Sequence, residues 1–334
     1  MKNSASDVSV AETPLRALYA PVEAELAEMD RILRAELESD YPYIEELVQY
    51  GCWLGGKRLR PALLLLCAKA VGDVKRDHLV LAAVVEMIHT ATLIHDDVLD
   101  DAKIRRHLAT VNSRWDTKTS VLLGDYLFTH AFYLASSVKS PAAMRILGET
   151  TNAVCEGELR QKGTRGDFSI TEDVYLGIIG AKTAELYACS CRLGAYLADG
   201  SHDCADQLAR FGRDVGIAFQ IVDDVLDLQG DERTMGKSLG TDLEQQKATL
   251  PLIRVLQAAT ANDRRDVLDI LRREANHRAA ALAPFFQRYH AFAYSYELAR
   301  RFARTAAGRL NGLAPSPACQ SLRELAEFVV SRTR

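Results

Sequence analysis

The sequence predicts an all-α protein that forms a single large helical bundle. Residues 79–100 and 207–228 are rich in Ala, Leu, Ile and Val, and their few polar residues cluster at one end. Helices that are apolar nearly all round pack inside a bundle. No proline lies between Pro141 and Pro251, which favours long helices joined by short loops. The 334 residues are 48% apolar, enough for a large core, and contain too few Pro and Gly for an all-β sandwich.

Taken in order, the chain begins with a polar stretch, residues 1–14, that we expect to be a flexible segment. Residues 15–334 are predicted to form one helical domain, because no Ser/Gly-rich linker or change in composition divides them. Within this domain, residues 264–282 show amphipathic spacing, which predicts a peripheral helix. Two polar loops, residues 101–112 and 229–248, each follow one of the two apolar helices.

Charge and cysteine content exclude several classes of protein. With 41 Lys+Arg against 45 Asp+Glu, the net charge of −4 does not suit a nucleic-acid binder. Seven scattered cysteines favour buried small side chains in a reducing compartment over a disulfide or metal framework. The N-terminus resembles neither a secretory signal nor a transit peptide, and the most apolar run, residues 62–68, is far shorter than the ~20 residues that span a bilayer. We therefore expect a cytoplasmic protein without stable membrane insertion.

An acidic pentapeptide, Asp-Asp-Val-Leu-Asp, occurs twice, at residues 96–100 and 223–227, each time at the end of an apolar helix. Positions i, i+1 and i+4 of a helix lie within about 100° of arc, so each copy presents three carboxylates on one face. Removing such clusters from water is costly without counter-charge. A single copy would be explained equally well by a solvated acidic helix end. Two copies favour the binding of a divalent metal ion. Mg²⁺ typically takes one or two carboxylates plus phosphate oxygens.

Basic residues near these motifs indicate what the metal would hold. The segment at residues 55–61, GGKRLRP, packs Lys57, Arg58 and Arg60 beside two glycines, a composition suited to wrapping a diphosphate. Further candidates follow in the chain: Arg105, Arg106, Lys182, Thr183 and Lys237. Each alone is more often a solvated surface residue. Together with two acidic clusters, they fit the binding of two diphosphates.

Two polar residues inside the apolar helices share the carboxylate stripe. His89 precedes Asp96 by seven residues, and Gln220 precedes Asp223 by three. A buried His or Gln satisfied by a neighbouring backbone group is an equally good explanation from the pattern alone. His95 points away from the stripe, and we expect it to be structural.

The motifs occur in the order and spacing typical of one family. They read GGKRLRP, HTATLIHDDVLDDAKIRR, GDYLFTHAF, AKTAEL, FQIVDDVLD and GKSLGTDLEQQKATLP, and the match runs from about Leu18 to the C-terminus. The chain resembles the trans-isoprenyl diphosphate synthases, and most closely the long-chain branch that makes octaprenyl, solanesyl and decaprenyl diphosphates for ubiquinone side chains. The resemblance implies the isoprenoid synthase fold, a helical bundle around a deep central apolar cavity. It also implies a homodimer.

The resemblance assigns roles position by position. The catalytic group would be Asp96, Asp100, Asp223 and Lys182. The first three would hold about three Mg²⁺ ions, supported by Asp97, Asp224 and Asp227. The diphosphate of isopentenyl diphosphate would be bound by Lys57, Arg60, His89 and Arg106. The allylic diphosphate would be bound by Arg105, Lys182, Thr183, Gln220 and Lys237. Two positions depart from the family pattern, because His107 and Gln246 stand where glycine is usual, and both put loop geometry in question.

The implied reaction needs no side-chain nucleophile, since metal and basic side chains stabilise a departing diphosphate. The growing prenyl chain would run along the first apolar helix away from Asp96. Ala91 and Thr92 stand one turn deeper, where short-chain members carry bulky aromatics, so small residues here predict a long product. Phe128 and Phe132 are candidates for a deeper floor, although ordinary core aromatics explain them at least as well.

Other interpretations stay open. A medium- or short-chain synthase, such as a geranylgeranyl diphosphate synthase, is the first alternative. A terpene cyclase would not need the second diphosphate site that GGKRLRP and Arg106 indicate. A non-catalytic partner subunit is expected to have lost carboxylates or the Lys-Arg segment, and here all are present. A calcium-binding or scaffold helical protein would leave the basic residues unexplained.

Overall fold

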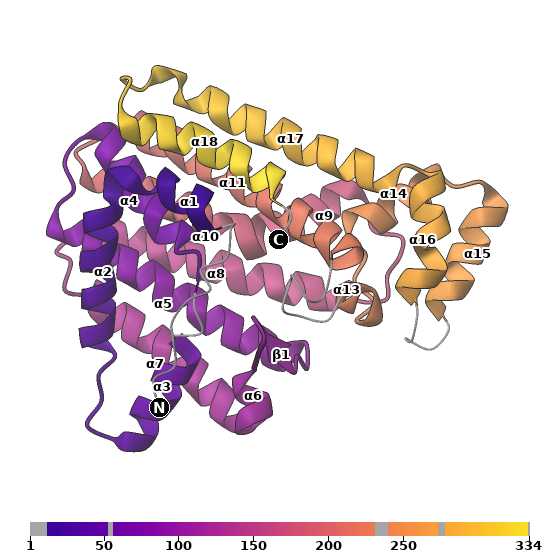
Figure 1. Ribbon diagram of the computed structural model, residues 1–334, viewed down its shortest axis with the longest axis horizontal. Helices are drawn as coiled ribbons and strands as arrows, with labels where there is room; N and C mark the ends of the chain where they lie inside the picture. Colours follow the sequence, from indigo (N-terminus) through magenta and orange to yellow (C-terminus); the bar gives the residue numbers. More distant parts are fainter. Residues whose placement is uncertain (1–11, 53–55, 231–239, 273–277, 333–334) are drawn as a thin grey trace.

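The computed structural model describes residues 12–52, 56–230, 240–272 and 278–332, and over these residues the prediction of an all-α bundle is confirmed apart from one small hairpin (Figure 1). The helices and helical turns are α1 (Glu12–Leu18), η1 (Ala20–Val22), α2 (Glu23–Glu36), α3 (Pro42–Cys52), α4 (Leu59–Val71), α5 (Arg76–Leu99), α6 (Val111–Arg114), α7 (Thr117–Ala135), α8 (Pro141–Gly163), α9 (Glu172–Ile179), the π-helical turn η2 (Gly180–Ala184), α10 (Glu185–Leu197), α11 (His202–Gln229), α13 (Thr241–Glu244), α14 (Leu250–Ala258), α15 (Ala261–Arg272), α16 (Arg278–Arg288), α17 (Ala291–Arg309), η3 (Leu310–Gly312) and α18 (Pro317–Ser331). The predicted division between residues 1–14 and 15–334 stays a prediction.

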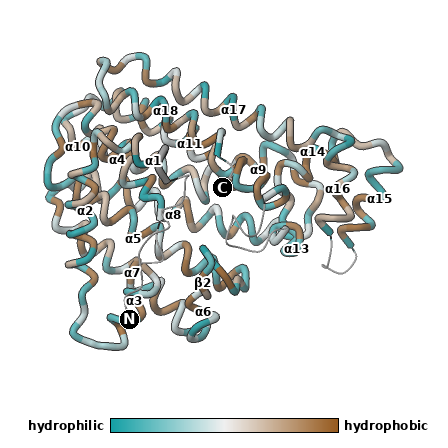
Figure 2. The backbone as a smooth tube through the Cα atoms, viewed as in Figure 1, coloured by the Kyte–Doolittle hydropathy of each residue, from teal (hydrophilic) through white to brown (hydrophobic). Residues whose placement is uncertain are grey.

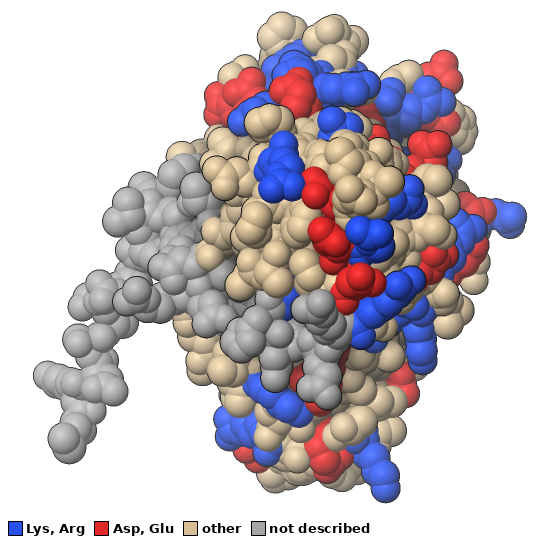
Figure 3. All heavy atoms as spheres, turned by 90° about the vertical axis from the view of Figure 1, so that its right-hand side faces the viewer, with Lys and Arg blue, Asp and Glu red and all other residues tan. Residues whose placement is uncertain are grey.

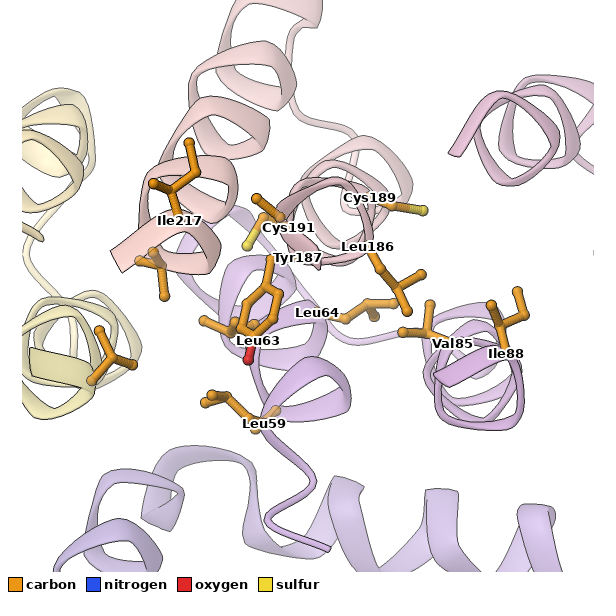
Figure 4. Close-up of a cluster of buried hydrophobic side chains, with 14 of the residues drawn as sticks. Leu59, Leu63, Leu64, Val85, Ile88, Leu186, Tyr187, Cys189, Cys191 and Ile217 are labelled. Carbon is orange, nitrogen blue, oxygen red and sulfur yellow. The ribbon is translucent and has the colours of Figure 1, made fainter. Parts of the chain in front are cut away.

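The core lies where α4, α5, α10 and α11 pack together (Figure 4). These helices contribute large side chains to one cluster, among them Leu63 of α4, Ile88 of α5, Tyr187 of α10 and Ile217 of α11. The run Leu63–Leu66 is fully buried, because α4 is apolar on every side. Burying each such leucine contributes about 1.5–3 kcal/mol to folding. The two long apolar helices that end in the acidic motifs, α5 and α11, therefore belong to the interior, as their composition predicts.

Polar caps fix where several helices begin. Asp116, Ser140, Ser201 and Ser316 each accept a hydrogen bond from the backbone N–H of the residue three positions on, at the starts of α7, α8, α11 and α18. Such a cap satisfies a donor that the helix itself leaves unpaired and is worth about 1 kcal/mol. The caps thus set the register of the helices that surround the acidic motifs.

The peripheral region differs from the single helix that we predicted over residues 264–282. The structure describes two helices there, α15 and α16, which pack against each other at one end of the bundle (Figure 1). Val267 and Leu271 of α15 are buried while its arginines face solvent, so the predicted amphipathic spacing is confirmed for that helix. Figure 2 shows the same alternation of polar and apolar residues along α17. The prediction of one helix over these residues was wrong. The structure has two helices, α15 and α16, that pack against each other, which one continuous helix could not do.

Among the helices that the structure describes, one, α5, is long and apolar enough to cross a membrane by length and composition. About two thirds of its most apolar window, 67%, is buried inside the bundle, which is typical of a core helix. All seven cysteines are free, and most are buried, as expected for small apolar side chains, although Cys155 is exposed.

The exception to the all-α prediction is a two-stranded antiparallel hairpin, β1 (Ile104–Arg105) and β2 (Leu108–Ala109). Its turn residues, Arg106 and His107, have φ of 51° and 66°, the left-handed conformation that suits the twist of a two-residue hairpin turn. Gln246 also has a positive φ, 58°. Both positions that depart from the family's glycines, His107 and Gln246, thus keep the backbone conformation that glycine adopts most easily.

Replacing His107 with glycine should stabilise the protein by up to about 1 kcal/mol, because a non-glycine residue pays a steric cost in this conformation. Chemical denaturation of the variant measures the change. Lys103→Gly, in the same exposed segment but without positive φ, is the matched control and should not stabilise. A destabilised His107→Gly protein would show that the imidazole makes a compensating contact.

Candidate active site

The two acidic motifs divide into exposed and buried carboxylates. Asp96, Asp100 and Asp223 are partly exposed, whereas the remaining three are buried, with exposed fractions of 5%, 5% and 1% for Asp97, Asp224 and Asp227. This division separates the residues that we predicted as metal ligands from those predicted to support them. The partly exposed group is the one that a dissolved ion or substrate can reach.

Each buried carboxylate has polar partners. Arg105 Nε donates to Asp97 Oδ1 over 2.8 Å. Asp224 accepts hydrogen bonds of 2.7 Å from the Tyr175 hydroxyl and from Gln220 Nε2. Burial raises the pKa of Asp224 to about 8, and Asp242 adds to this effect. The carboxyl group therefore benefits from a nearby positive charge if it is to be ionised at neutral pH.

Two lysines pair with the first motif, and their neighbours contact the helix or the carboxylates of the second. Lys182 Nζ lies 3.7 Å from Asp96 Oδ2 and also pairs with Glu158 of α8 at 2.5 Å. The next residue, Thr183, donates its hydroxyl hydrogen to Gln220 Oε1 over 2.9 Å, on the helix that carries Asp223. Burial alone would lower the pKa of Lys182, but the two carboxylates outweigh it and the pKa is raised. The ammonium group is therefore charged beside the first motif, and Thr183 next to it contacts the helix of the second.

The second bridge passes through Lys247, whose Nζ lies 3.0 Å from Asp100 Oδ2 and 3.4 Å from Asp242 Oδ1. The backbone N–H of Asp242 in turn donates to Asp227 Oδ2 over 3.2 Å. The two pentapeptides, 127 positions apart in sequence, therefore face the same site. On the other side of that site, Arg332 approaches Asp223 Oδ1 at 3.5 Å and lies over the Phe219 ring, 3.8 Å from its centroid.

Lys182 and Thr183 are positioned by η2, which interrupts the α9–α10 helix. A π-helical turn of this kind is frequent at functional sites. It is accommodated because glycines face it: a Cβ added to Gly157 of α8 would lie 2.4 Å from the Lys182 backbone N, and one at Gly216 of α11 would lie 2.6 Å from the Ala184 Cα. The absence of side chains at Gly157 and Gly216 therefore lets the η2 backbone, which carries Lys182, pack closely against α8 and α11.

A pocket at the polar end of α5 collects the second group of predicted residues. His89 and Arg106 line it together with Arg58, Glu86 and Arg105. Arg60 NH1 lies 3.0 Å from His89 Nε2, and its guanidinium stacks 4.4 Å from the centroid of the Tyr187 ring. Arg105, predicted for the allylic diphosphate, lines the same pocket through its contact with Asp97. Several cations thus surround one pocket large enough for small polar groups, an arrangement that attracts a polyanion.

The loop that carries Lys57 is anchored by two contacts. Tyr19 donates its hydroxyl hydrogen to the Lys57 carbonyl over 2.8 Å, and Arg58 NH1 pairs with the buried Glu86 at 2.6 Å. A Cβ on Gly56 would lie 3.4 Å from Arg106 NH1, so the loop and the arginine are neighbours. Lys57 itself is exposed at the edge of this arrangement.

Some predicted residues are placed differently from the rest. Lys237 lies outside the described residues. His95 contacts α7, with Nε2 at 3.2 Å from the Val121 carbonyl, which agrees with the structural role that we expected. The two pockets described at the site are lined by none of Ala91, Thr92 and Phe132, so the deep apolar cavity stays a prediction.

Sequence reasoning missed several polar residues that contact the motifs. They are Arg165, Tyr175, Gln245, Lys247 and Arg332. It also missed Glu86 and Glu158, which pair with Arg58 and Lys182. Lys247 lies within the polar loop at residues 229–248, which could have signalled it. Lone residues such as Arg165 and Arg332 carry no local signal, because only packing brings them to the carboxylates.

His89 is held neutral. Burial lowers its pKa well below the usual range, and Arg60 and Arg106 lower it further. A neutral ring can accept at Nε2 from Arg60, which leaves the proton on Nδ1. Arg60 therefore keeps its orientation only while His89 stays unprotonated.

Protein stability should accordingly fall as the pH drops below about 6.5, the ordinary pKa of histidine, because the unfolded chain then binds a proton that the folded chain refuses. His89→Gln, which keeps an acceptor without titrating, should lose part of this pH dependence. Urea unfolding of both proteins at pH 7.5 and pH 5.5 measures the difference. Identical pH dependence in the two proteins would show that His89 titrates normally.

The donor set fits a hard divalent cation bound together with phosphate oxygens. Within the described residues, no three His, Cys, Asp or Glu side chains are gathered closely enough to enclose an ion by themselves. The accessible donors are carboxylate oxygens, one or two from each motif, with basic side chains beside them. Mg²⁺ keeps few protein ligands and takes the remainder from substrate phosphates and water. The site therefore suits a metal–diphosphate complex better than a bare ion.

Comparison with known proteins matches this geometry. Residues 41–285 match the family model described as polyprenyl synthetase. The chain belongs to the polyprenyl synthetase family. It is 34% identical over 313 residues to the octaprenyl diphosphate synthase of Escherichia coli, covering 93% of this chain and 96% of that protein. It is also 36% identical over 282 residues to a short chain isoprenyl diphosphate synthase of Methanothermobacter thermautotrophicus, covering 83% and 87%.

The fold agrees with that assignment. A polyprenyl synthase from Caulobacter crescentus, whose crystal structure contains calcium and isoprenyl diphosphate, superposes with a TM-score of 0.90 and 34% identity over 96% of this chain and 98% of that one. The protein is therefore a prenyltransferase of the polyprenyl synthetase family, and a trans-polyprenyl diphosphate synthase.

Proposed function

We propose that this synthase makes long chains, by Mg²⁺-dependent, sequential head-to-tail condensation of isopentenyl diphosphate onto an allylic diphosphate such as farnesyl diphosphate. The expected products are octaprenyl to decaprenyl diphosphates, which supply the ubiquinone side chain. One observation carries the proposal: Lys247 pairs with Asp100 of the first motif and with Asp242, whose backbone N–H donates to Asp227 of the second, and a separate pocket lined by arginines lies at the end of α5. A condensing enzyme needs two anion sites, one for each substrate diphosphate.

The residues divide the work as follows. Asp96, Asp100 and Asp223 would hold about three Mg²⁺ ions, whose charge stabilises the departing diphosphate. Lys182, with Thr183 and Gln220, would bind the allylic diphosphate at the same place and stabilise the charge that develops as the C–O bond ionises.

On the other side, Arg60, Arg106 and the neutral His89 would hold the diphosphate of isopentenyl diphosphate, with Lys57 at the edge. Its terminal double-bond carbon attacks the allylic cation, and a proton is then lost, with the released diphosphate as the nearest base. The buried pairing of Asp97 with Arg105 would keep the end of α5 in place. No described side chain needs to form a covalent bond.

A long product is supported by small residues at the predicted start of the chain channel. Ala91 is fully buried, and the Thr92 hydroxyl bonds back to the His89 carbonyl over 2.8 Å, which leaves only a methyl group to project. Phe128 and Phe132 of α7 stack with centroids 5.3 Å apart and are candidates for a floor. A geranylgeranyl-type short-chain enzyme remains the second candidate, because relatives of both kinds match the chain at similar identity.

Replacing Ala91 with phenylalanine should shorten the product by several isoprene units, because the ring would block the space about 7.5 Å, or five residues, below Asp96 on the helix. Chromatographic sizing of dephosphorylated products measures the change. Phe132→Ala should lengthen or leave the product unchanged. An Ala91→Phe enzyme that is active and makes full-length product would refute the channel along α5.

We further propose a cytoplasmic homodimer that binds small-molecule substrates, without nucleic acid and without stable membrane insertion. An exposed stripe on α7, with Leu122 67% and Tyr133 72% exposed, offers an apolar surface to a second copy. The face of the molecule in Figure 3 mixes acidic and basic residues, unlike the basic surface that nucleic acids need. A non-catalytic subunit is disfavoured by the complete set of carboxylates and basic residues.

Incubating the purified chain with farnesyl diphosphate, labelled isopentenyl diphosphate and Mg²⁺, and then sizing the products, tests the proposal. We expect labelled prenyl chains of 40 to 50 carbons, the lengths of octaprenyl to decaprenyl. Products that stop at 20 carbons would establish the short-chain alternative. A chain that makes no product alone but activates another synthase would establish the partner-subunit alternative.

A further inference from the structure

The carboxylate of Asp100 is held on both oxygens by cations from two separate loops. Arg165 NH2 lies 2.7 Å from Oδ1, and Lys247 Nζ lies 3.0 Å from Oδ2. Gln245 Nε2 adds a 2.9 Å hydrogen bond to the Asp100 carbonyl. This group, Arg165, Gln245 and Lys247, is called the Asp100 clamp below.

The residues of the clamp come from two loops that contact each other. Arg165 follows the end of α8, and Lys247 lies between α13 and α14. The backbone N–H of Gly166 donates to the Gln246 carbonyl over 3.0 Å, so the two loops contact each other directly. The unusual positive φ of Gln246 places that carbonyl and the neighbouring Lys247 side chain where both contacts form.

The clamp also has unused hydrogen-bonding capacity. Arg165 Nε is buried and has no partner among the described residues, and the side chain as a whole remains 28% exposed. A guanidinium that binds one carboxylate oxygen through a single nitrogen can still form a paired contact with a phosphate. A phosphate that accepts two hydrogen bonds from the Arg165 guanidinium would therefore bind it more strongly than Asp100 does through a single nitrogen.

Electrostatics gives the clamp a definite effect on metal binding. Two positive charges beside Asp100 repel a bare divalent cation from that carboxylate and compete for its oxygens. A diphosphate reverses the balance, because its oxygens bind the metal and the arginine at the same time and neutralise both. The clamp thus disfavours metal alone and favours metal that arrives with diphosphate.

We propose that Arg165 is a further positioning residue of this enzyme, which makes divalent-metal binding at Asp100 depend on the presence of diphosphate. It pairs with Asp100 when no diphosphate is bound and transfers to the diphosphate oxygens when the metal–diphosphate complex binds. Lys247 supports it from the second loop. The inference rests on the proposed function, since it assumes that Asp100 and a diphosphate share the site.

If Arg165 only connected the two loops, its removal would have different effects. The two roles can be separated by whether its removal raises or lowers the affinity for metal alone and for metal with diphosphate. If Arg165 only held the loops together, its removal would weaken metal alone and metal with diphosphate alike, and would lower thermal stability. If it positions diphosphate, its removal should tighten metal alone and weaken metal with diphosphate. Only the second role moves the two affinities in opposite directions.

The experiment measures Mn²⁺ binding to the full chain by electron paramagnetic resonance, with and without inorganic diphosphate. In Arg165→Gln, we expect Mn²⁺ alone to bind about threefold or more tightly, and Mn²⁺ with diphosphate about tenfold more weakly, than in the wild type. Arg165→Lys should restore most of the charge effect but not the paired contact. Lys162→Gln, which removes a charge from an exposed position close by, is the matched control and should change neither affinity.

Thermal unfolding of each variant accompanies the titrations, and Arg165→Lys keeps the test valid should Arg165→Gln unfold. Equal Mn²⁺ affinities in wild type and Arg165→Gln, or a parallel loss of both affinities, would overturn the inference and leave the proposed function standing. A wild-type chain that binds neither Mn²⁺ nor diphosphate would overturn both.

Discussion

Replacing Asp96 or Asp223 with asparagine should lower turnover by about 10²- to 10³-fold, the loss typical when one electrostatic contact to a developing charge is removed. Each change keeps the size of the side chain and removes the charge that would bind metal. Because both side chains are partly exposed, folding should be nearly unaffected. Steady-state kinetics with saturating Mg²⁺ measures the loss, and thermal unfolding verifies the fold.

Asp101→Asn is the matched control for this pair. Asp101 follows Asp100 directly, but its side chain is 83% exposed and pairs only with Lys103, at 2.8 Å, among the contacts shown for the described residues. Its φ of 49° is one that asparagine tolerates well. The control should retain wild-type turnover. Full activity in Asp96→Asn or Asp223→Asn would show that the corresponding motif does not take part in the reaction.

Adding one methyl group at Gly157 should lower both stability and turnover. A Cβ there would lie 2.4 Å from the Lys182 backbone N and 2.9 Å from its Cα, contacts that real side chains do not make. Since helix backbone on both sides must shift, we expect Gly157→Ala to cost about 1–3 kcal/mol. Moving Lys182 away from Asp96 should reduce turnover by about a hundredfold, because misplacement of about 1 Å is enough for such a loss.

Gly148→Ala, on the same helix, controls for the helix effect of the substitution. A Cβ at Gly148 meets no atom within 4 Å, so this variant should gain about 0.5–1 kcal/mol and keep its activity. Chemical denaturation and kinetics on the two variants should therefore give opposite signs for stability. If Gly157→Ala were as stable and active as Gly148→Ala, the close packing of α8 on η2 would not position Lys182.

Sequence reasoning predicted the parts of the site that repeat or have fixed helical spacing. The repeated pentapeptide places Asp96 and Asp223 at the ends of interior helices, since composition alone marks α5 and α11 as buried. The shared stripe also predicts that Gln220 lies near the carboxylates, and it donates to Asp224. The fold class followed from the same two helices and from the absence of proline between them.

Contacts set by tertiary packing could not be predicted in this way. Arg165 and Lys247 reach Asp100 from positions 65 and 147 residues away. Arg165 belongs to no local pattern that distinguishes it from a surface cation, and the polar loop that holds Lys247 does not reveal which carboxylate it contacts. The β1–β2 hairpin was missed because Arg106-His107 lacks the Asn-Gly or Asp-Gly signature of its turn. Residues 264–282 were predicted as one helix because amphipathic periodicity does not reveal that α15 and α16 pack against each other.

The most direct test of the account locates the metal. Crystals of the protein grown with Mn²⁺ and inorganic diphosphate would be examined by anomalous diffraction at the manganese edge. We expect anomalous peaks between the carboxylates of Asp96, Asp100 and Asp223, with the diphosphate between the peaks and Lys182. Ions bound to only one motif, or to neither while diphosphate is bound elsewhere, would contradict the claim that the two motifs form a single metal–diphosphate site.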